Sequence, residues 1–119
     1  MRYFEDIELG EVWDLGERPV DANEIMAFAA HYDPMPCHCE AVAAKESYFG
    51  SLTASSWHVN AMAMGLLTNS FKAQGLVSLG SPGINRVRWF VPVRPGDVLS
   101  GRSTVMAMRT SNSRPMGIV

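Results

Sequence analysis

Residues 56–73 constrain the fold more than any other part of this chain, because apolar side chains occupy nearly every face of a helix drawn through them. One set recurs at helical spacing: Trp57, Ala61, Met64, Leu67 and Phe71. Further apolar residues fall on the other sides: Ala54, Ala63 and Leu66. A helix that is apolar all round is typical of a protein interior. The pattern therefore predicts a central buried helix, with Gly75 as its terminator.

From Ile84 onward the apolar pattern changes from the helical period to simple alternation. Val87, Trp89 and Val91 alternate with Arg86, Arg88 and Phe90. Alternation predicts a strand with one buried face and one mixed face. A turn is expected over Pro92–Gly96, a second strand over Val98–Met108, and the beginning of a third over Met116–Val119.

The N-terminal half predicts an irregular strand followed by short helices. The strand is expected over Glu11–Val20. Asp21, followed three positions later by Glu24, resembles a capping box and predicts a helix over residues 22–31. Two prolines, Pro34 and Pro36, end this helix and stiffen a loop over residues 33–39. A further helical turn is expected over residues 40–46. Together these elements predict an α+β fold in which an antiparallel sheet wraps a central helix, as one domain over residues 1–119.

Composition narrows the classes of partner. Charged residues make up 18% of the 119 residues, against about 25% in an average soluble protein, which favours burial of one face in a homodimer or a dimer of dimers. The net charge is −2 and no basic stripe is present, which argues against nucleic acid as a partner. No segment reads as a secretory signal or a membrane span. We therefore expect a cytoplasmic protein with no membrane partner.

Asp33 and His38 are the first candidates for chemistry. The carboxylate and the imidazole lie five positions apart on the proline-stiffened stretch, and such a pair can share the proton transfers that add or remove water across a C=C bond. Considered by spacing alone, the alternative is the commoner outcome: Asp33 caps a turn and His38 is a half-buried ring.

The run from Ser51 to His58, which leads into the predicted central helix, is the second candidate. A helix N-terminus offers free backbone N–H groups and a positive dipole end, which can polarise a thioester carbonyl and stabilise an enolate. Simple N-capping by Ser55 or Ser56 is the alternative. The two interpretations are compatible, because the first uses backbone and the second uses side chains.

Two other groups of residues are given structural interpretations. Cys37 and Cys39 flank His38, but metal-binding cysteine pairs usually have two to four residues between them, so no metal is expected. The stretch from Arg86 to Asp97 reads as a strand, a turn and solvated arginines, of which one or two could reach a ligand phosphate.

Four blocks of the sequence, in order, resemble the MaoC-like dehydratase family. They are Tyr3–Gly10, Ile25–His38, Ala54–His58 and Arg88–Asp97. The resemblance implies the hot-dog fold and (R)-specific enoyl-CoA hydratase chemistry, or its reverse, on an acyl-CoA thioester. It implies that Asp33 is the base acting on one water and that His38 is the acid protonating Cα. It also implies substrate-binding positions at Ser56, Trp57 and Gly83, and no cofactor.

Three departures from the family pattern accompany this resemblance. Met35 stands where the family often has Asn or Gln, and Ser56 replaces a usual Gly. Family domains also continue for about two strands beyond the segment that resembles residues 113–119, so we expect a sheet without its last strands.

Two other functions remain open from sequence. One is a hot-dog acyl-CoA thioesterase, which the pairing of His38 with Asp33 disfavours, because hydrolysis of a thioester needs no acid aimed at Cα. The other is a non-catalytic acyl-CoA-binding or structural subunit, which Met35 and the expected short sheet keep open.

Overall fold

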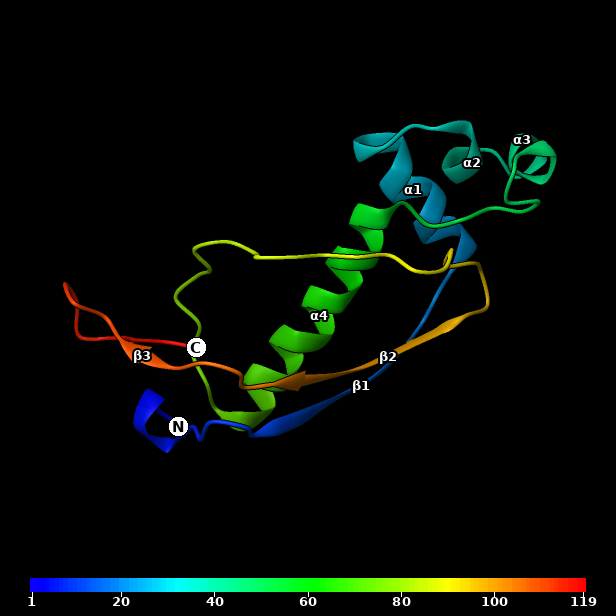
Figure 1. Ribbon diagram of the computed structural model, residues 1–119. Coiled ribbons are helices and arrows are strands. Elements are labelled where there is room, and N and C mark those ends of the chain that lie inside the picture. The colour runs from blue at the N-terminus through cyan, green and yellow to red at the C-terminus, as the bar shows by residue number, and fades with distance from the viewer.

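The computed structural model describes all residues from Met1 to Val119. The helical elements are a 3-10 helix (Phe4–Asp6), α1 (Ala22–Tyr32), α2 (Pro36–Cys39), α3 (Ala41–Glu46) and α4 (Ser56–Gln74). The strands are β1 (Val12–Pro19), β2 (Val98–Thr104), β3 (Arg109–Thr110) and β4 (Gly117–Ile118). Figure 1 shows α4 along the middle, the β1–β2 ribbon beside it, and α1 to α3 gathered where α4 begins.

The long helix forms where the sequence predicts it. α4 spans Ser56–Gln74, and Gly75 caps it in the left-handed conformation with φ of 71°. Leu76 N–H donates to Phe71 O at 2.8 Å, which satisfies one of the last helical carbonyls. A residue with a side chain is strained at that φ, so glycine is the residue that lets the chain leave α4 here.

The burial predicted for α4 is wrong. Only His58 and Met62 of this helix are buried, whereas Trp57 is 65% exposed and Met64 is 51% exposed. The reason is that β1 and β2 form a sheet of two strands, which covers one side of the helix and leaves the others open.

The predicted irregular strand is confirmed as β1, which pairs antiparallel with β2. The register shifts by one residue between Asp14 and Glu17, where Gly16 has φ of 78°. This is the geometry of a β-bulge with glycine at the left-handed position. The bulge twists the ribbon so that it follows the side of α4.

The strand predicted from Ile84 to Val91 is not formed. Residues 77–92 make no backbone–backbone hydrogen bond, and every one of them is exposed. We call this segment, residues 77–92, the strap. Alternation specifies two faces for a strand but supplies no hydrogen-bonding neighbour, and none of the strands of this chain pairs with the strap. The strap instead crosses α4 as an extended coil, where the indole N–H of Trp89 donates to Asn60 Oδ1 at 3.1 Å.

Other predictions near the chain ends are partly confirmed. The strand expected over residues 98–108 ends early, at Thr104, and a separate short strand, β3, follows. The strand expected at 116–119 is present as β4, and it pairs with β3.

The three short helices form a compact group over the start of α4. The side chain of Asp21 accepts the Glu24 N–H at 2.9 Å, which confirms the predicted cap of α1. The stretch predicted as a rigid loop after α1 contains one helical turn, α2, because Pro36 occupies its first position, where the fixed φ of proline favours a helix.

A small hydrophobic core holds this group of helices against α4. It consists of Val20, Ile25, Ala44, Leu52, Ala54 and Met62. Ile25 is fully buried. The best-packed part of the molecule is therefore the part that carries Asp33 and His38.

The other end of α4 is tied to the N-terminus. The Arg2 guanidinium donates to Gln74 and forms an ion pair with Glu11 at 2.8 Å. The Trp13 indole N–H, the Glu8 backbone N–H and Arg2 all donate to Glu11, and these hydrogen bonds lower the pKa of its carboxyl.

Candidate active site

Asp33 and His38 lie face to face in the structure. Asp33 is the C-cap residue of α1, and His38 lies in α2. The Asp33 Oδ2 atom is 3.6 Å from His38 Nε2. This distance is too long for a direct hydrogen bond. Each group therefore keeps hydrogen-bonding capacity for a third molecule, which would lie beside the line that joins the two atoms.

The backbone of Thr53 fixes the orientation of the His38 ring. His38 Nδ1 lies 2.6 Å from the Thr53 carbonyl oxygen, and a carbonyl only accepts, so Nδ1 carries a proton. The Thr53 hydroxyl is 3.3 Å from the same nitrogen. Because Nδ1 is committed in this way, Nε2 is the nitrogen that points at Asp33 and is available for proton transfer.

A buried hydroxyl holds the carboxylate. Ser55 Oγ donates to Asp33 Oδ2 at 2.7 Å, and Ser55 has no exposed surface. Oδ2 thus faces both the hydroxyl and the imidazole, whereas no protein group hydrogen-bonds to Oδ1. The side chain of Asp33 is 27% exposed and that of His38 is 12% exposed, so solvent reaches both groups although most of their surface is buried.

The segment that supplies both contacts is itself immobilised. Residues 52–55 are the longest buried run in the chain. Thr53 N–H donates to Cys37 O at 3.2 Å, and Ala54 N–H donates to Val93 O at 2.8 Å. A catalytic pair needs this kind of support, because its geometry must be kept within a fraction of an ångström.

The predicted substrate-binding residues are only partly brought together. Ser56 is the first residue of α4 and directly follows Ser55. Trp57 projects outward and meets the Trp89 ring edge-on, with centroids 6.2 Å apart. Gly83 lies in the strap, where its N–H and carbonyl bond to the Ser81 hydroxyl. No contact joins Gly83 to Asp33 or His38.

Ser55 and Thr53 contact the Asp33–His38 pair, and the sequence did not predict either contact. The sequence offers Ser55 as a helix cap, yet its side chain makes no cap hydrogen bond. A serine in front of a helix carries no signal that separates these two uses, because the partner, Asp33, is 22 residues away in sequence.

His58, the third histidine, has a structural place. It is buried, stacks on Phe28 with ring centroids 4.6 Å apart, and lies 3.3 Å from Glu24 Oε1. Glu24 also pairs with Arg18. These contacts join β1, α1 and α4.

Two further findings concern metal binding and membrane crossing. No three side chains among the histidines, cysteines and acidic residues are grouped so that they could hold a metal ion. None of the helices combines the length and apolarity that crossing a membrane requires.

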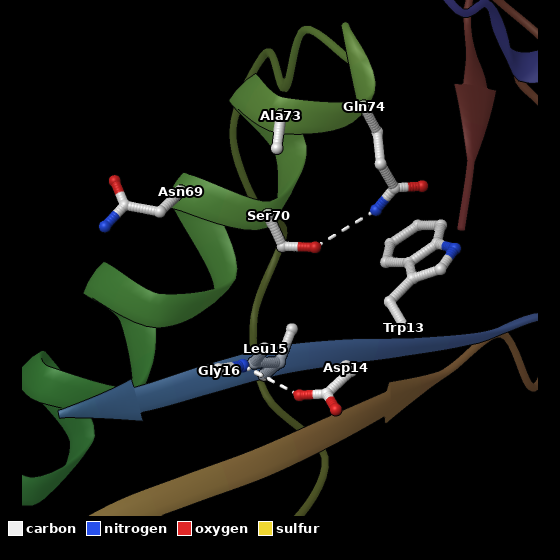
Figure 2. Close-up of a pocket in the computed structure, with 8 residues that line it drawn as sticks. All are labelled: Trp13, Asp14, Leu15, Gly16, Asn69, Ser70, Ala73 and Gln74. Atoms are coloured by element: carbon white, nitrogen blue, oxygen red, sulfur yellow. Dashed lines mark hydrogen bonds between the residues drawn. The ribbon is translucent and has the colours of Figure 1, made fainter.

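A cleft of about 450 Å³ opens at the opposite end of α4. Figure 2 shows its walls, in which Asn69, Ser70, Ala73 and Gln74 of α4 face Trp13, Asp14, Leu15 and Gly16 of β1. Asn69 is 13 residues beyond Ser56 along the helix, or about 20 Å at 1.5 Å per residue. The cleft is therefore separate from the Asp33–His38 site.

Comparison with known proteins adds family evidence to this geometry. Residues 6–118 match the model that describes the MaoC like domain. The chain belongs to the MaoC-like family. This confirms the resemblance carried by the four sequence blocks.

Solved structures confirm the hot-dog fold for this MaoC-like chain. A MaoC-like dehydratase from Rhodospirillum rubrum is 40% identical, with a TM-score of 0.78 over 97% of this chain and 77% of that one. An (R)-hydratase from A. caviae involved in PHA biosynthesis is 24% identical, with a TM-score of 0.70 over 93% of this chain and 80% of that one. At that identity, the second likeness concerns the fold alone.

A curated relative is considerably longer than this chain. Protein MaoC from Klebsiella aerogenes is 26% identical over 114 residues, which are 95% of this chain and 33% of that protein. The MaoC-like chain therefore spans about a third of the length of this relative.

Proposed function

We propose that this MaoC-like chain catalyses reversible hydration of an α,β-unsaturated acyl thioester of the enoyl-CoA type. The observation that carries the proposal is the pairing of Asp33 Oδ2 with His38 Nε2 at 3.6 Å, on supports that fix both groups. Membership in a family whose relatives include a dehydratase from Rhodospirillum rubrum supports the same class of reaction.

Each side chain has a distinct role in the proposed hydration step. The Asp33 carboxylate takes a proton from water as the water oxygen bonds to Cβ of the substrate. The electron pair of the C=C bond moves toward the thioester carbonyl, and Cα takes the proton that His38 carries on Nε2. Water has then been added as OH at Cβ and H at Cα, and the proton on Asp33 restores His38 through solvent. Because Nδ1 is already protonated, His38 must be an imidazolium at the start of this direction.

The thioester oxygen needs a hydrogen-bond donor while the enolate exists. The Ser56 backbone N–H at the start of α4 is the proposed donor, because the helix dipole is positive there. In this mechanism Asp33 and His38 act on the C=C bond from one face, so we propose syn addition and an (R)-3-hydroxyacyl product.

The first test is an assay of crotonyl-CoA with two readouts. Loss of the absorbance of the conjugated enoyl group reports hydration, and release of free CoA thiol reports hydrolysis. We expect loss of absorbance without thiol release. Thiol release at the same rate would instead identify a thioesterase, and binding with neither change would identify a non-catalytic acyl-CoA-binding subunit.

We also propose that the chain works as a homodimer or a dimer of dimers. Only 12 of 119 residues are buried, and the strap displays Ile84, Trp89 and Phe90 with unpaired backbone on either side. Exposed strand-like edges and apolar patches are where chains associate.

Light scattering at micromolar concentration measures this association directly. We expect a mass of at least twice that of the chain. The double variant Trp89→Ser, Phe90→Ser should lower the mass, whereas Val42→Ser, which changes an exposed apolar residue on α3, should leave it unchanged. A monomeric mass for the unaltered chain would contradict the proposal.

A further inference from the structure

Ser55 is a serine in a capping position that does not cap its helix. A serine at this place ordinarily accepts a hydrogen bond from an N–H of the first helical turn. Ser55 has the extended ψ of 142° at the N-cap of α4, yet its side chain makes no such bond. Its hydroxyl instead reaches back to Asp33 Oδ2 at 2.7 Å.

No water competes with Asp33 for the hydrogen bond of the Ser55 hydroxyl. The residue has no exposed surface, so water does not reach its hydroxyl. Its neighbour Ala54 is anchored to Val93 O at 2.8 Å, which fixes the direction of the backbone. A buried hydroxyl that donates to a carboxylate is a charge-assisted hydrogen bond and is stronger than a neutral one.

The contact also decides which carboxylate oxygen can act. Oδ2 accepts from Ser55 and is the oxygen 3.6 Å from His38 Nε2. Rotation of the carboxylate about its last bond would break the hydrogen bond to Ser55. The oxygen without a protein partner, Oδ1, is therefore held in one direction and keeps its hydrogen-bonding capacity for another molecule.

We infer that Ser55 is a positioning residue for Asp33, which holds the carboxylate so that Oδ1 is presented to the reacting water. The inference rests on the proposed hydratase function. It predicts that the hydroxyl contributes to turnover rather than to substrate binding, because Ser55 is buried behind the carboxylate and has no exposed surface with which to contact a substrate.

The kinetic test is Ser55→Ala, assayed by hydration of crotonyl-CoA. We expect kcat to fall by about 10- to 100-fold, the scale for a misplaced general base, with KM within twofold. Ser55→Cys keeps nearly the same shape with a weaker donor, so its kcat should lie between the two, and it replaces the alanine variant if that variant fails to fold. In an Asp33→Asn background, Ser55→Ala should have no further effect, because groups that act as a unit are non-additive.

Ser70→Ala is the matched control, since Ser70 is a half-buried serine within α4 whose hydroxyl accepts from the Gln74 side chain at 3.0 Å. Its kcat should be unchanged. An unaltered kcat in Ser55→Ala, or an equal loss in both Asp33 and Asp33→Asn backgrounds, would overturn the inference.

A second measurement separates this inference from the proposed function. Urea denaturation midpoints of Ser55→Ala, Asp33→Ala and the double variant form a cycle that needs no activity. If the unaltered chain hydrates no thioester, the proposed function fails, and the cycle then decides on Ser55 alone. Shifts of the midpoint that do not add in the double variant support the contact between Ser55 and Asp33, and shifts that add overturn the inference.

Discussion

Asp33→Asn and His38→Gln each lower the hydration rate of a short trans-enoyl-CoA by at least about a hundredfold, if both groups act on one water. Without the carboxylate the water is not activated, and without the imidazolium Cα receives no proton. Neither group replaces the other, so the double variant should be hardly slower than either single variant.

The controls for this expectation follow from the structure. Asp33 directly follows α1 and His38 lies in α2. Pro34, Pro36 and the core around Ile25 hold these helices in place, so both variants should keep their circular dichroism and still bind acyl-CoA. His31→Gln, which changes an exposed histidine of α1, should retain the normal rate. Near-normal rates in the single variants, or effects that simply add, would contradict the shared-water mechanism.

Ile25→Ala has the largest effect expected on stability. Ile25 is fully buried at the centre of the small core, and removal of such a side chain costs about 2–5 kcal/mol. The whole stability of a domain is about 5–15 kcal/mol. The urea midpoint should therefore fall sharply, and part of the population should be unfolded without denaturant if the chain lies near the lower limit.

Val42→Ala provides the comparison, because Val42 is 77% exposed on α3. Its free energy of unfolding should change by less than about 0.5 kcal/mol. Equal shifts in the two variants would mean that the core around Ile25 does not hold the short helices on α4. The slope of each denaturation curve should stay constant, which keeps the two midpoints comparable.

Short sequence patterns correctly predicted the elements whose hydrogen bonds join residues close together in the sequence. The cap at Asp21, the long helix and its end at Gly75 are all determined by residues within a few positions of one another. The strap shows the limit of such reasoning. Alternation around Trp89 predicted a strand that does not form, because a strand also needs a hydrogen-bonding neighbour, and none of the strands of this chain pairs with the strap.

The sequence predicted one part of the candidate site and missed another. The sequence named Asp33 and His38, because an acid and an imidazole on a proline-containing stretch are recognisable by type and spacing. It did not indicate that the Ser55 hydroxyl would donate to Asp33 instead of capping α4, or that the Thr53 carbonyl oxygen would orient His38. Those contacts depend on how residues 52–55 pass between α2 and Val93, which is a property of packing.

The contacts that orient the pair all come from a short, contiguous part of the chain. Thr53 is 15 residues from His38, and Ser55 is 22 residues from Asp33. The strap contributes none of them. Substitutions in the strap therefore leave the side chains and carbonyl that orient Asp33 and His38 unchanged, and the strap reaches this part of the molecule only through its neighbour Val93, whose carbonyl accepts from Ala54.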